Sequence, residues 1–584
     1  MNRRELLIAG ILALGIFLLL VPFARMGVDP HHDGAMLKPA MDVLSGQVLF
    51  RDTFSQYGAL TTYLHAAVLW LWPTLFALKL FTAASYGLSA FFLYLAWREF
   101  LPRNLAVLSC AVLFFFLPSY EKQVWGVDFT LLPWSSAMAL LFQAIGLLAL
   151  MRIVSCRRTE FWAGVLGACC GAICWCRLPV GVTTTGGVFV IGFCLLLTGW
   201  RPSDTSLKKA AALGLLGFLS INLIMLASVV IPGATEEWWY QNFVWPGKWA
   251  GGSAGASPIK MGLFFRPLQE ILWLLLGSGL IAALSLLRQF PSRISPWIVW
   301  GLLALLGGII AFHGKTLWLL LSARQGSWAL LVPLAVAALA LVDTVRCFAR
   351  RNAPPRAELH VTAAAAGYAL ASLAQYFPIA DPWHAFWALG PGFGIAILAF
   401  WRTAGIRAGI AALVLMLLMG PAWLDKWDSA SAMLNRTWVD LREPAVLTGM
   451  RSNERDARLY AAISAAIKRA QVVRPHIPIV LIGRNALWLC FSSNLENPTP
   501  LNVTWPGLIT PKTEAQRWAY IQKFRPLVVA DNVNWELIDD FYRRDHYAPL
   551  LYFHDFALEI GAPQELLQAA GVPAGGIPLP TVKP

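Results

Sequence analysis

Charged residues are scarce in this chain. Asp, Glu, Lys and Arg make up 13% of its 584 residues, about half of the ~25% that soluble proteins carry. Apolar residues make up 58%, and several apolar stretches of about 18 residues or more are each long enough to cross a bilayer. A soluble enzyme, a disordered hub and a disulfide-rich secreted module are therefore excluded, and the chain is predicted to be a polytopic α-helical membrane protein.

Several common site patterns are also absent from the sequence. It has no Gly-rich phosphate loop, no internal repeat that stands out, and no Cys or His spacing typical of zinc. All but one of its nine Cys lie in or beside apolar stretches, where such small side chains serve in helix packing. Only Cys490 lies in a polar region, so we predict no disulfide framework.

Basic residues are distributed in a way that favours a membrane over nucleic acid as partner. The net charge is +14, and Lys and Arg stand in short clusters between apolar stretches rather than in a continuous stripe. With a cytoplasmic N-terminus and an uncleaved signal anchor as the first span, these clusters fall in inner loops, as the positive-inside rule requires. We expect a multi-pass protein of a bacterial inner membrane with about 13 spans. The expected spans are 6–23, 73–97, 104–118, 131–153, 161–177, 180–199, 208–231, 268–288, 296–313, 326–343, 360–377, 384–401 and 406–424, with a further apolar helix at 57–70 near the surface.

The last part of the chain has a different composition. Between 426 and 584, helix-like stretches alternate with short apolar runs, which predicts an α/β domain after a membrane domain of residues 1–425. An odd number of spans places this domain on the outer, extracytoplasmic side. The expected helices are 454–470, 513–524 and 535–544, and the expected strands are 477–482, 487–491, 526–530 and 550–553.

The first outer loop carries a polar cluster that is unusual for such an apolar chain. It opens with Asp29–Gly34 and continues through Arg51–Asp52 to Tyr57–Gly58. One span followed by a long outer loop that opens with acidic residues resembles the beginning of the GT-C membrane glycosyltransferases. The likeness is to their protein-mannosyltransferase and aminoarabinose-transferase branch. A late acidic outer turn at Asp381–His384 and an outer soluble tail are also similar to many members.

The resemblance implies an inverting glycosyltransferase. Such an enzyme moves a sugar from a polyprenyl-phosphate donor to a glycan, lipid or protein acceptor at the outer face of the membrane. Carried over to this sequence, it implies that Asp33 is the general base, which takes the proton of the acceptor hydroxyl as its oxygen attacks the anomeric carbon. Taken by itself, Asp33 could also be a solvated loop residue or a helix N-cap before Ala35.

Other polar residues near the outer interface complete the candidate site. A leaving lipid phosphate needs positive charge to stabilise it, and Arg177, Lys315 and Arg324 could supply that charge. Anchoring to phospholipid head groups is the alternative for Arg177 and Lys315. The remaining candidates for substrate binding are His32, Tyr57, Glu121, Asp128, Asp381 and His384.

A divalent cation is a further candidate partner of the first loop. Asp29 and His31 offer carboxylate and imidazole ligands, which suit Mg²⁺ or Mn²⁺. Ordinary loop polarity explains the same residues without a metal.

Three other functions compete with glycosyl transfer. A transporter or flippase for a lipid-linked glycan should carry ionisable residues at mid-membrane, whereas here the polar residues gather at one face. A polysaccharide polymerase or ligase is expected to concentrate basic residues in a late outer loop. A non-catalytic assembly subunit is compatible with the same pattern.

Overall fold

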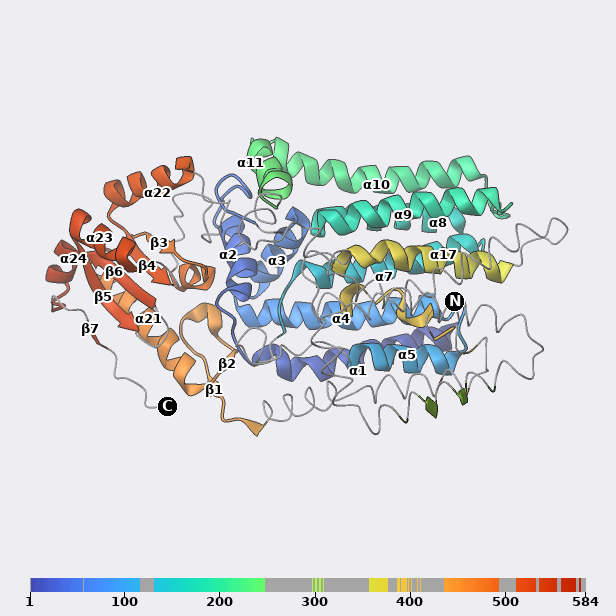
Figure 1. Ribbon diagram of the computed structural model, residues 1–584, viewed down its shortest axis with the longest axis horizontal. Helices are drawn as coiled ribbons and strands as arrows, with labels where there is room; N and C mark the ends of the chain where they lie inside the picture. Colours follow the sequence, from blue (N-terminus) through green and yellow to red (C-terminus); the bar gives the residue numbers. More distant parts are fainter. Residues whose placement is uncertain are drawn as a thin grey trace.

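The computed structural model describes two large parts of the chain, a helical bundle and a C-terminal domain (Figure 1). Among the expected spans, 268–288, 326–343 and 406–424 lie wholly or almost wholly outside the described residues, and most of 296–313 does too. The expected number of thirteen spans is therefore not tested. The described residues are 2–55, 57–115, 131–246, 357–376, most of 386–398, 435–492, 511–531, 535–553, 558–573, 577–578 and isolated positions between 297 and 410.

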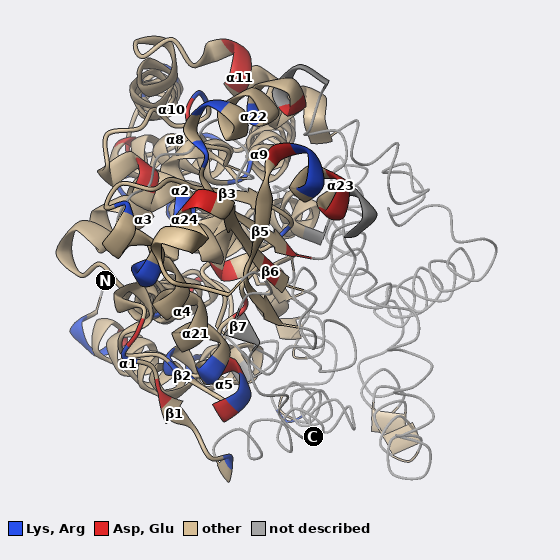
Figure 2. Cartoon of the chain, turned by 90° about the vertical axis from the view of Figure 1, so that its left-hand side faces the viewer, with Lys and Arg blue, Asp and Glu red and all other residues tan. Residues whose placement is uncertain are grey.

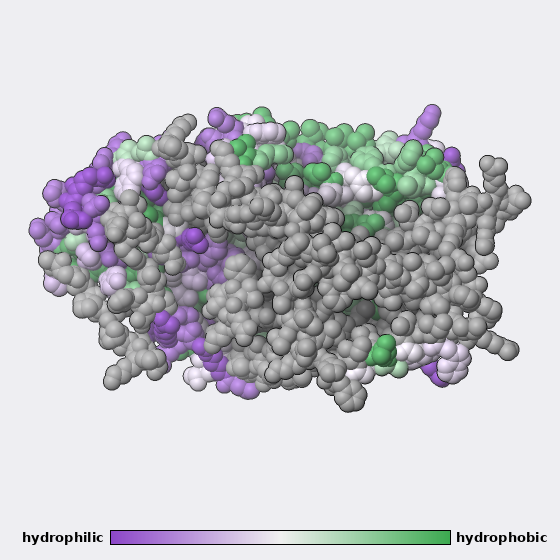
Figure 3. Space-filling model, in the orientation of Figure 1, coloured by the Kyte–Doolittle hydropathy of each residue, from purple (hydrophilic) through white to green (hydrophobic). Residues whose placement is uncertain are grey.

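Six described helices are long and apolar enough to cross a membrane. They run side by side along the bundle (Figure 1), and each coincides with an expected span. Figure 3 shows an apolar surface over α10 and a hydrophilic one over the C-terminal domain, as expected for one lipid-facing and one water-facing part. The six are α1 (Arg3–Arg25), α4 (Leu75–Trp97), α7 (Ser135–Val154), α8 (Thr159–Cys176), α9 (Leu178–Leu197) and α10 (Leu207–Val230).

Shorter helices accompany these six. α5 (Arg103–Phe115) and α17 (Ala357–Ser372) overlap the expected spans at 104–118 and 360–377, and α17 continues into a 3₁₀ turn, η2 (Leu373–Tyr376). α2 (His32–Leu44) and α3 (Ala59–Leu71) lie at the end of the bundle that faces the C-terminal domain (Figure 1). α3 confirms the expected apolar helix at 57–70. We call this end of the bundle the domain-facing end.

Glycine lets α8 and α10 pack unusually closely. A Cβ on Gly167 of α8 would lie 1.9 Å from the carbonyl oxygen of Gly214, and a Cβ on Gly217 of α10 would lie 2.2 Å from that of Gly164. Small residues one turn apart bring helix backbones into direct contact, which is a principal source of helix association in lipid. The glycines of α8 and α10, which have no side chain, therefore allow these two helices to pack in direct contact.

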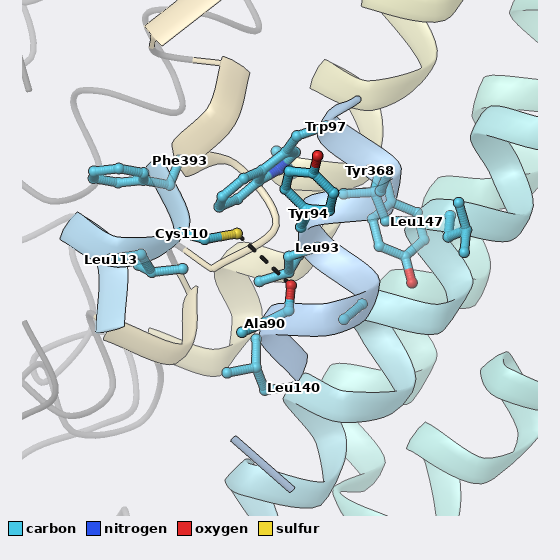
Figure 4. Close-up of a cluster of buried hydrophobic side chains, with 14 of the residues drawn as sticks. Ala90, Leu93, Tyr94, Trp97, Cys110, Leu113, Leu140, Leu147, Tyr368 and Phe393 are labelled. Carbon is cyan, nitrogen blue, oxygen red and sulfur yellow. Dashed lines mark hydrogen bonds between the residues drawn. The ribbon is translucent and has the colours of Figure 1, made fainter. Parts of the chain in front are cut away.

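The interior of the bundle is filled by large apolar side chains from several helices. Figure 4 shows Trp97 of α4, Leu147 of α7 and Tyr368 of α17 around one cluster, all with less than 2% of their surface exposed. The Sγ of Cys110 on α5 donates to the carbonyl oxygen of Ala90, 3.7 Å away. Cys110 thus packs between helices, as predicted for the Cys of apolar stretches.

The C-terminal domain is built on a five-stranded mixed sheet with the order β3-β4-β6-β5-β7. β3 pairs parallel with β4 and β5 pairs parallel with β7, whereas the two remaining pairs are antiparallel. Figure 2 shows residues of both charge signs side by side on the described part of this domain. The strands are β3 (Ile479–Ile482), β4 (Leu527–Asp531), β5 (Tyr547–Phe553), β6 (Leu558–Pro563) and β7 (Ile577–Pro578), and the helices are α21 (Glu454–Val473), α22 (Pro511–Phe524), α23 (Trp535–Asp545) and α24 (Gln564–Ala569).

One expected strand of this domain is wrong. Residues 487–491 belong to a 3₁₀ helix, η4 (Ala486–Phe491), in which every side chain is buried. A short, fully buried apolar run carries no periodicity that separates a strand from a helix. The expected helices and the other three expected strands coincide with α21, α22, α23, β3, β4 and β5.

The C-terminal domain shares a hydrophobic core with the bundle. One cluster of buried residues joins Leu37 of α2 and Leu78 of α4 to Ile463 and Leu487 of the domain. A short two-stranded sheet, β1 (Val439–Asp440) with β2 (Arg451–Ser452), adds a backbone bond, because Gly27 N donates to the carbonyl oxygen of Arg451 at 2.9 Å. The domain is therefore packed directly on the first loop and on α2.

Gly34 marks the tightest point of this contact. A Cβ on Gly34 would lie 2.2 Å from Leu487 N and 2.8 Å from the carbonyl carbon of Ala486. Both atoms belong to the backbone of η4, which cannot turn aside as a side chain can. We expect Gly34→Ala to destabilise the protein by about 1–3 kcal/mol through overpacking. The loss should appear as a lower thermal midpoint and as faster proteolysis at the junction around residues 435–450.

Gly10→Ala is the matched control for this prediction. Gly10 lies within α1, and apart from the neighbouring backbone of α1 itself no described atom comes within 4 Å of the position of its Cβ. Ala is a better helix former than Gly, so this variant should be as stable as the parent or slightly more stable. Equal stability of the two variants would contradict the close contact between α2 and η4.

Candidate functional site

Asp29 organises the start of α2. Its Oδ1 accepts hydrogen bonds from His31 N at 2.9 Å and from His32 N at 3.0 Å. Its Oδ2 lies 2.6 Å from His32 Nδ1. Asp29 therefore satisfies backbone donors at the beginning of the helix and also fixes the His32 ring.

Asp33 lies in the first turn of α2 and has no exposed surface. Its Oδ2 is 2.8 Å from Lys79 Nζ and accepts from Asp29 N at 2.9 Å. Lys79 Nζ also donates to the carbonyl oxygen of Gly27 at 2.9 Å. Asp33 Oδ1 has no hydrogen-bond partner among the described residues. Asp33 is thus a buried, ion-paired carboxylate and neither a solvated loop residue nor the N-cap of α2.

The two carboxylates differ in their electrostatic surroundings. Burial raises the pKa of Asp33 to about 6, and the like charge of Asp29 acts in the same direction, while Lys79 opposes both. Burial also works to raise the pKa of Asp29, but the charge and hydrogen bonds of His32 outweigh it and hold that pKa below its usual range. At neutral pH both groups are therefore ionised, and Asp33 is much the stronger base of the two.

A second buried ion pair fixes the other end of α2. Lys38 Nζ contacts Asp42 Oδ1, and both side chains are almost completely buried. Asp42 Oδ2 also accepts from Thr53 Oγ1 at 2.5 Å, which ties the loop after α2 back onto the helix. Sequence reasoning missed this pair, although a Lys and an Asp four residues apart on one helix are the usual signal for it.

Lys79 was missed for a different reason. It falls within the expected span 73–97, which is defined by its apolar neighbours. An ionisable residue inside an apolar span is normally paired or functional, which is the signal that could have found it.

His32, Arg177 and Tyr57 lie near the ends of α7, α8 and α9. The His32 ring packs edge-on against Trp134 with a centroid distance of 5.1 Å. Ser136 lies two residues after Trp134, and its Oγ contacts Arg177 Nη1. Arg177 stands at the junction of α8 and α9. Gly58 N donates to the carbonyl oxygen of Cys176 at 3.1 Å, which brings the adjacent Tyr57 to the same junction. The structure therefore collects these candidates at the domain-facing end of α7, α8 and α9.

A glutamine that sequence reasoning passed over also holds the first loop. Gln241 lies in a short π-helix, η1 (Tyr240–Val244), which follows α11 (Thr235–Trp239). Its Nε2 donates to the carbonyl oxygen of Phe50 at 2.7 Å, and its Oε1 accepts from Ser55 N at 3.2 Å. The segment after α10 therefore braces the part of the loop that leads to Tyr57.

The remaining candidates lie outside the described residues. These are Glu121, Asp128, Lys315, Arg324, Asp381 and His384. Their roles stay predictions.

The predicted cation ligands are engaged within the protein. His31 Nδ1 lies 2.7 Å from the carbonyl oxygen of Arg484, which can only accept, so this nitrogen carries the proton. Both oxygens of Asp29 already accept hydrogen bonds. Within the described part of the chain, no group of three or more His, Cys, Asp or Glu side chains converges as metal ligands do. Asp29 and His31 alone therefore do not make up a fitting metal site.

Comparison with known proteins gives only distant structural likenesses. No family model and no curated protein matches the chain. Among solved structures, ArnT from Cupriavidus metallidurans bound to undecaprenyl phosphate is similar over 95% of this chain and 97% of its own, with 14% identity and a TM-score of 0.48. The Archaeoglobus fulgidus oligosaccharyltransferase complex with Zn and sulfate is similar over 96% of this chain and 73% of its own, with 13% identity and a TM-score of 0.46.

With identities of 14% and 13% and TM-scores of 0.48 and 0.46, these likenesses carry no argument about individual residues of this chain. The roles of individual residues therefore have to rest on the side chains described above.

Proposed function

We propose that the protein is an inverting glycosyltransferase that takes a sugar from a polyprenyl-phosphate donor at the outer face of the membrane. The acceptor is a glycan, a lipid or a protein. The observation that carries this proposal is a fully buried carboxylate, Asp33, with one oxygen left without a partner among the described residues, beside the Asp29–His32 pair. A carboxylate of raised pKa next to one of lowered pKa is an arrangement typical of general acid–base chemistry.

In this proposal Asp33 acts as the general base. The acceptor hydroxyl donates to Asp33 Oδ1, which supplies the hydrogen bond that this oxygen lacks. As the hydroxyl oxygen bonds to the anomeric carbon, its proton passes to Asp33 and the bond from that carbon to the phosphate oxygen breaks. Attack from the side opposite the leaving group inverts the anomeric configuration.

The neighbouring residues take supporting roles. His32 keeps 17% of its side chain exposed while Asp33 is covered, so the acceptor would approach past the His32 ring. Asp29 holds that ring in place. Lys79 holds the Asp33 carboxylate, and its position on α4 ties the base to a membrane helix.

The leaving group is a lipid phosphate, and Arg177 is proposed to stabilise its charge. A guanidinium can form two parallel hydrogen bonds to a phosphate, which suits it to this role. Lys315 and Arg324 are proposed to add positive charge. Tyr57, Glu121, Asp128, Asp381 and His384 are proposed to contact donor or acceptor.

The distribution of charge along the spans favours this function over transport. In the six described spans every Asp, Glu, Lys and Arg lies within five residues of a helix end, Lys79 being the fifth residue of α4. A secondary transporter is expected to bind its substrate and coupling ion near the middle of the membrane. A reaction at one end of the bundle agrees better with the positions of these charges than transport through its middle.

Sugar transfer from a polyprenyl phosphate by the reconstituted parent protein is the direct test. We expect product from a polyprenyl-phosphate sugar of defined anomeric configuration, and NMR of the product should show the opposite configuration at that carbon. A nucleotide sugar without lipid serves as the control donor and should give no product. Retention of configuration, or transfer only from the nucleotide sugar, would contradict the proposal.

A further inference from the structure

A buried carboxylate in the C-terminal domain stands at the end of a parallel strand pair. Asp531 is the last residue of β4, and it has no exposed surface. Its Oδ1 accepts from Arg484 N at 2.7 Å, and its Oδ2 accepts from Trp488 Nε1 at 2.8 Å and from Asn485 N at 3.3 Å. All three donors belong to residues Gly483–Trp488, which comprise the turn after β3 and the first residues of η4, and which we call the Gly483–Trp488 turn. Burying a carboxylate is costly unless it is hydrogen-bonded, and here those bonds go to a single turn.

The same turn is the part of the C-terminal domain that contacts the candidate site. The carbonyl oxygen of Arg484 accepts from His31 Nδ1 at 2.7 Å, and Leu487 N donates to the carbonyl oxygen of Pro30 at 3.2 Å. The backbone of Leu487 also lies directly against Gly34. These contacts reach residues 30–34, the stretch that carries His32 and Asp33.

The three contacts named above are made by backbone atoms of the turn. Their positions therefore depend on the conformation of the turn, and that conformation is fixed by the Asp531 carboxylate. The close fit of Gly483 adds to this, because a Cβ there would lie 1.9 Å from Asp531 Oδ1.

We propose that Asp531 is a positioning residue for the candidate site and that the Gly483–Trp488 turn forms one wall of it. The C-terminal domain is then part of the catalytic centre and not a separate module for acceptor access. The expected effect of Asp531 on turnover rests on the proposed function, whereas its expected effect on the conformation of the site does not. Asp531 itself touches no substrate in this proposal.

Asp531→Asn tests the proposal with little change of shape. An amide keeps one accepting oxygen, but its NH₂ group then faces an N–H donor of the turn. We expect faster amide hydrogen exchange in peptides covering 27–36, in addition to peptides of the turn itself. We also expect kcat to fall on the order of 10²-fold, as a displacement of about 1 Å at a catalytic group can cause, with a smaller change in the KM for the donor.

Two further variants keep the test decisive if Asp531→Asn folds poorly. Trp488→Phe removes one donor to Asp531 while keeping an aromatic ring, and it should act in the same direction but more weakly. Asp540→Asn on α23 is the matched control, because Asp540 is exposed and pairs only with the nearby Arg543 in the described structure. It should leave exchange at 27–36 and kcat unchanged.

The two readouts separate this inference from the proposed function. Faster exchange confined to the C-terminal domain, with residues 27–36 exchanging as in the parent, would overturn the inference and leave Asp531 a stabilising residue of its own domain. If the parent transfers no sugar at all, the proposed function fails, and the exchange measurement alone decides the role of Asp531.

Discussion

Replacing Asp33 with Asn is expected to lower the turnover of sugar transfer by about 10²–10⁴-fold, the range by which general bases typically contribute. Asn has nearly the same shape but cannot accept the proton of the acceptor hydroxyl. Binding of the donor should change little, because the lipid phosphate is proposed to be held by Arg177 and not by Asp33. The measurement is kcat and KM with a polyprenyl-phosphate sugar in reconstituted membranes.

The single variant also removes the partner of a buried Lys79. An uncompensated buried charge can cost about 3–5 kcal/mol of stability, so lost activity alone would not separate catalysis from folding. The double variant Asp33→Asn/Lys79→Met removes both charges. We expect it to regain thermal stability relative to Asp33→Asn while its turnover stays low. Recovery of turnover together with stability would show that Asp33 serves only as the counter-ion of Lys79.

The membrane helices could be predicted from the sequence because their signal is local. An apolar stretch of sufficient length can be identified without knowing what packs against it. The ends of all six long described helices agree with the expected spans to within a few residues. The helix α2 could not be predicted in this way. The sequence places its residues in the first outer loop, because the contacts that hold Asp33 within a helix depend on burial under another domain.

The candidate site was only partly predictable. The polar cluster at 29–33 is evident from the sequence, because four polar residues, two Asp and two His, stand together after an apolar span. Lys79 and Asp531 were not found, since their importance comes from contacts across the fold. The bond from His31 to Arg484, for example, joins residues 453 positions apart. The composition of the buried run 487–491 predicts a strand, whereas in the fold this run is a 3₁₀ helix that covers α2.

Replacing Lys79 with Met is expected to move the acid limb of the pH–activity profile. In the parent, activity should depend on the ionised Asp33 carboxylate, whose pKa is raised to about 6. Turnover should therefore fall about tenfold per pH unit below that value. Lys79 lowers the pKa of Asp33, so its removal raises that pKa further and shifts the limb to higher pH. The variant should be strongly impaired at pH 7 and should recover activity as the pH rises.

This shift separates the electrostatic role of Lys79 from a purely structural one. A structural defect would lower activity at every pH, whereas a raised pKa of Asp33 leaves activity intact once the carboxyl group ionises. Lys468→Met is the matched control, because Lys468 is an exposed residue of α21 paired with Glu443 and lies outside the site. It should leave the limb at its parental position. An unmoved limb in Lys79→Met would assign the titrating group to a residue other than Asp33, and the Asp29–His32 pair would then be the base to test.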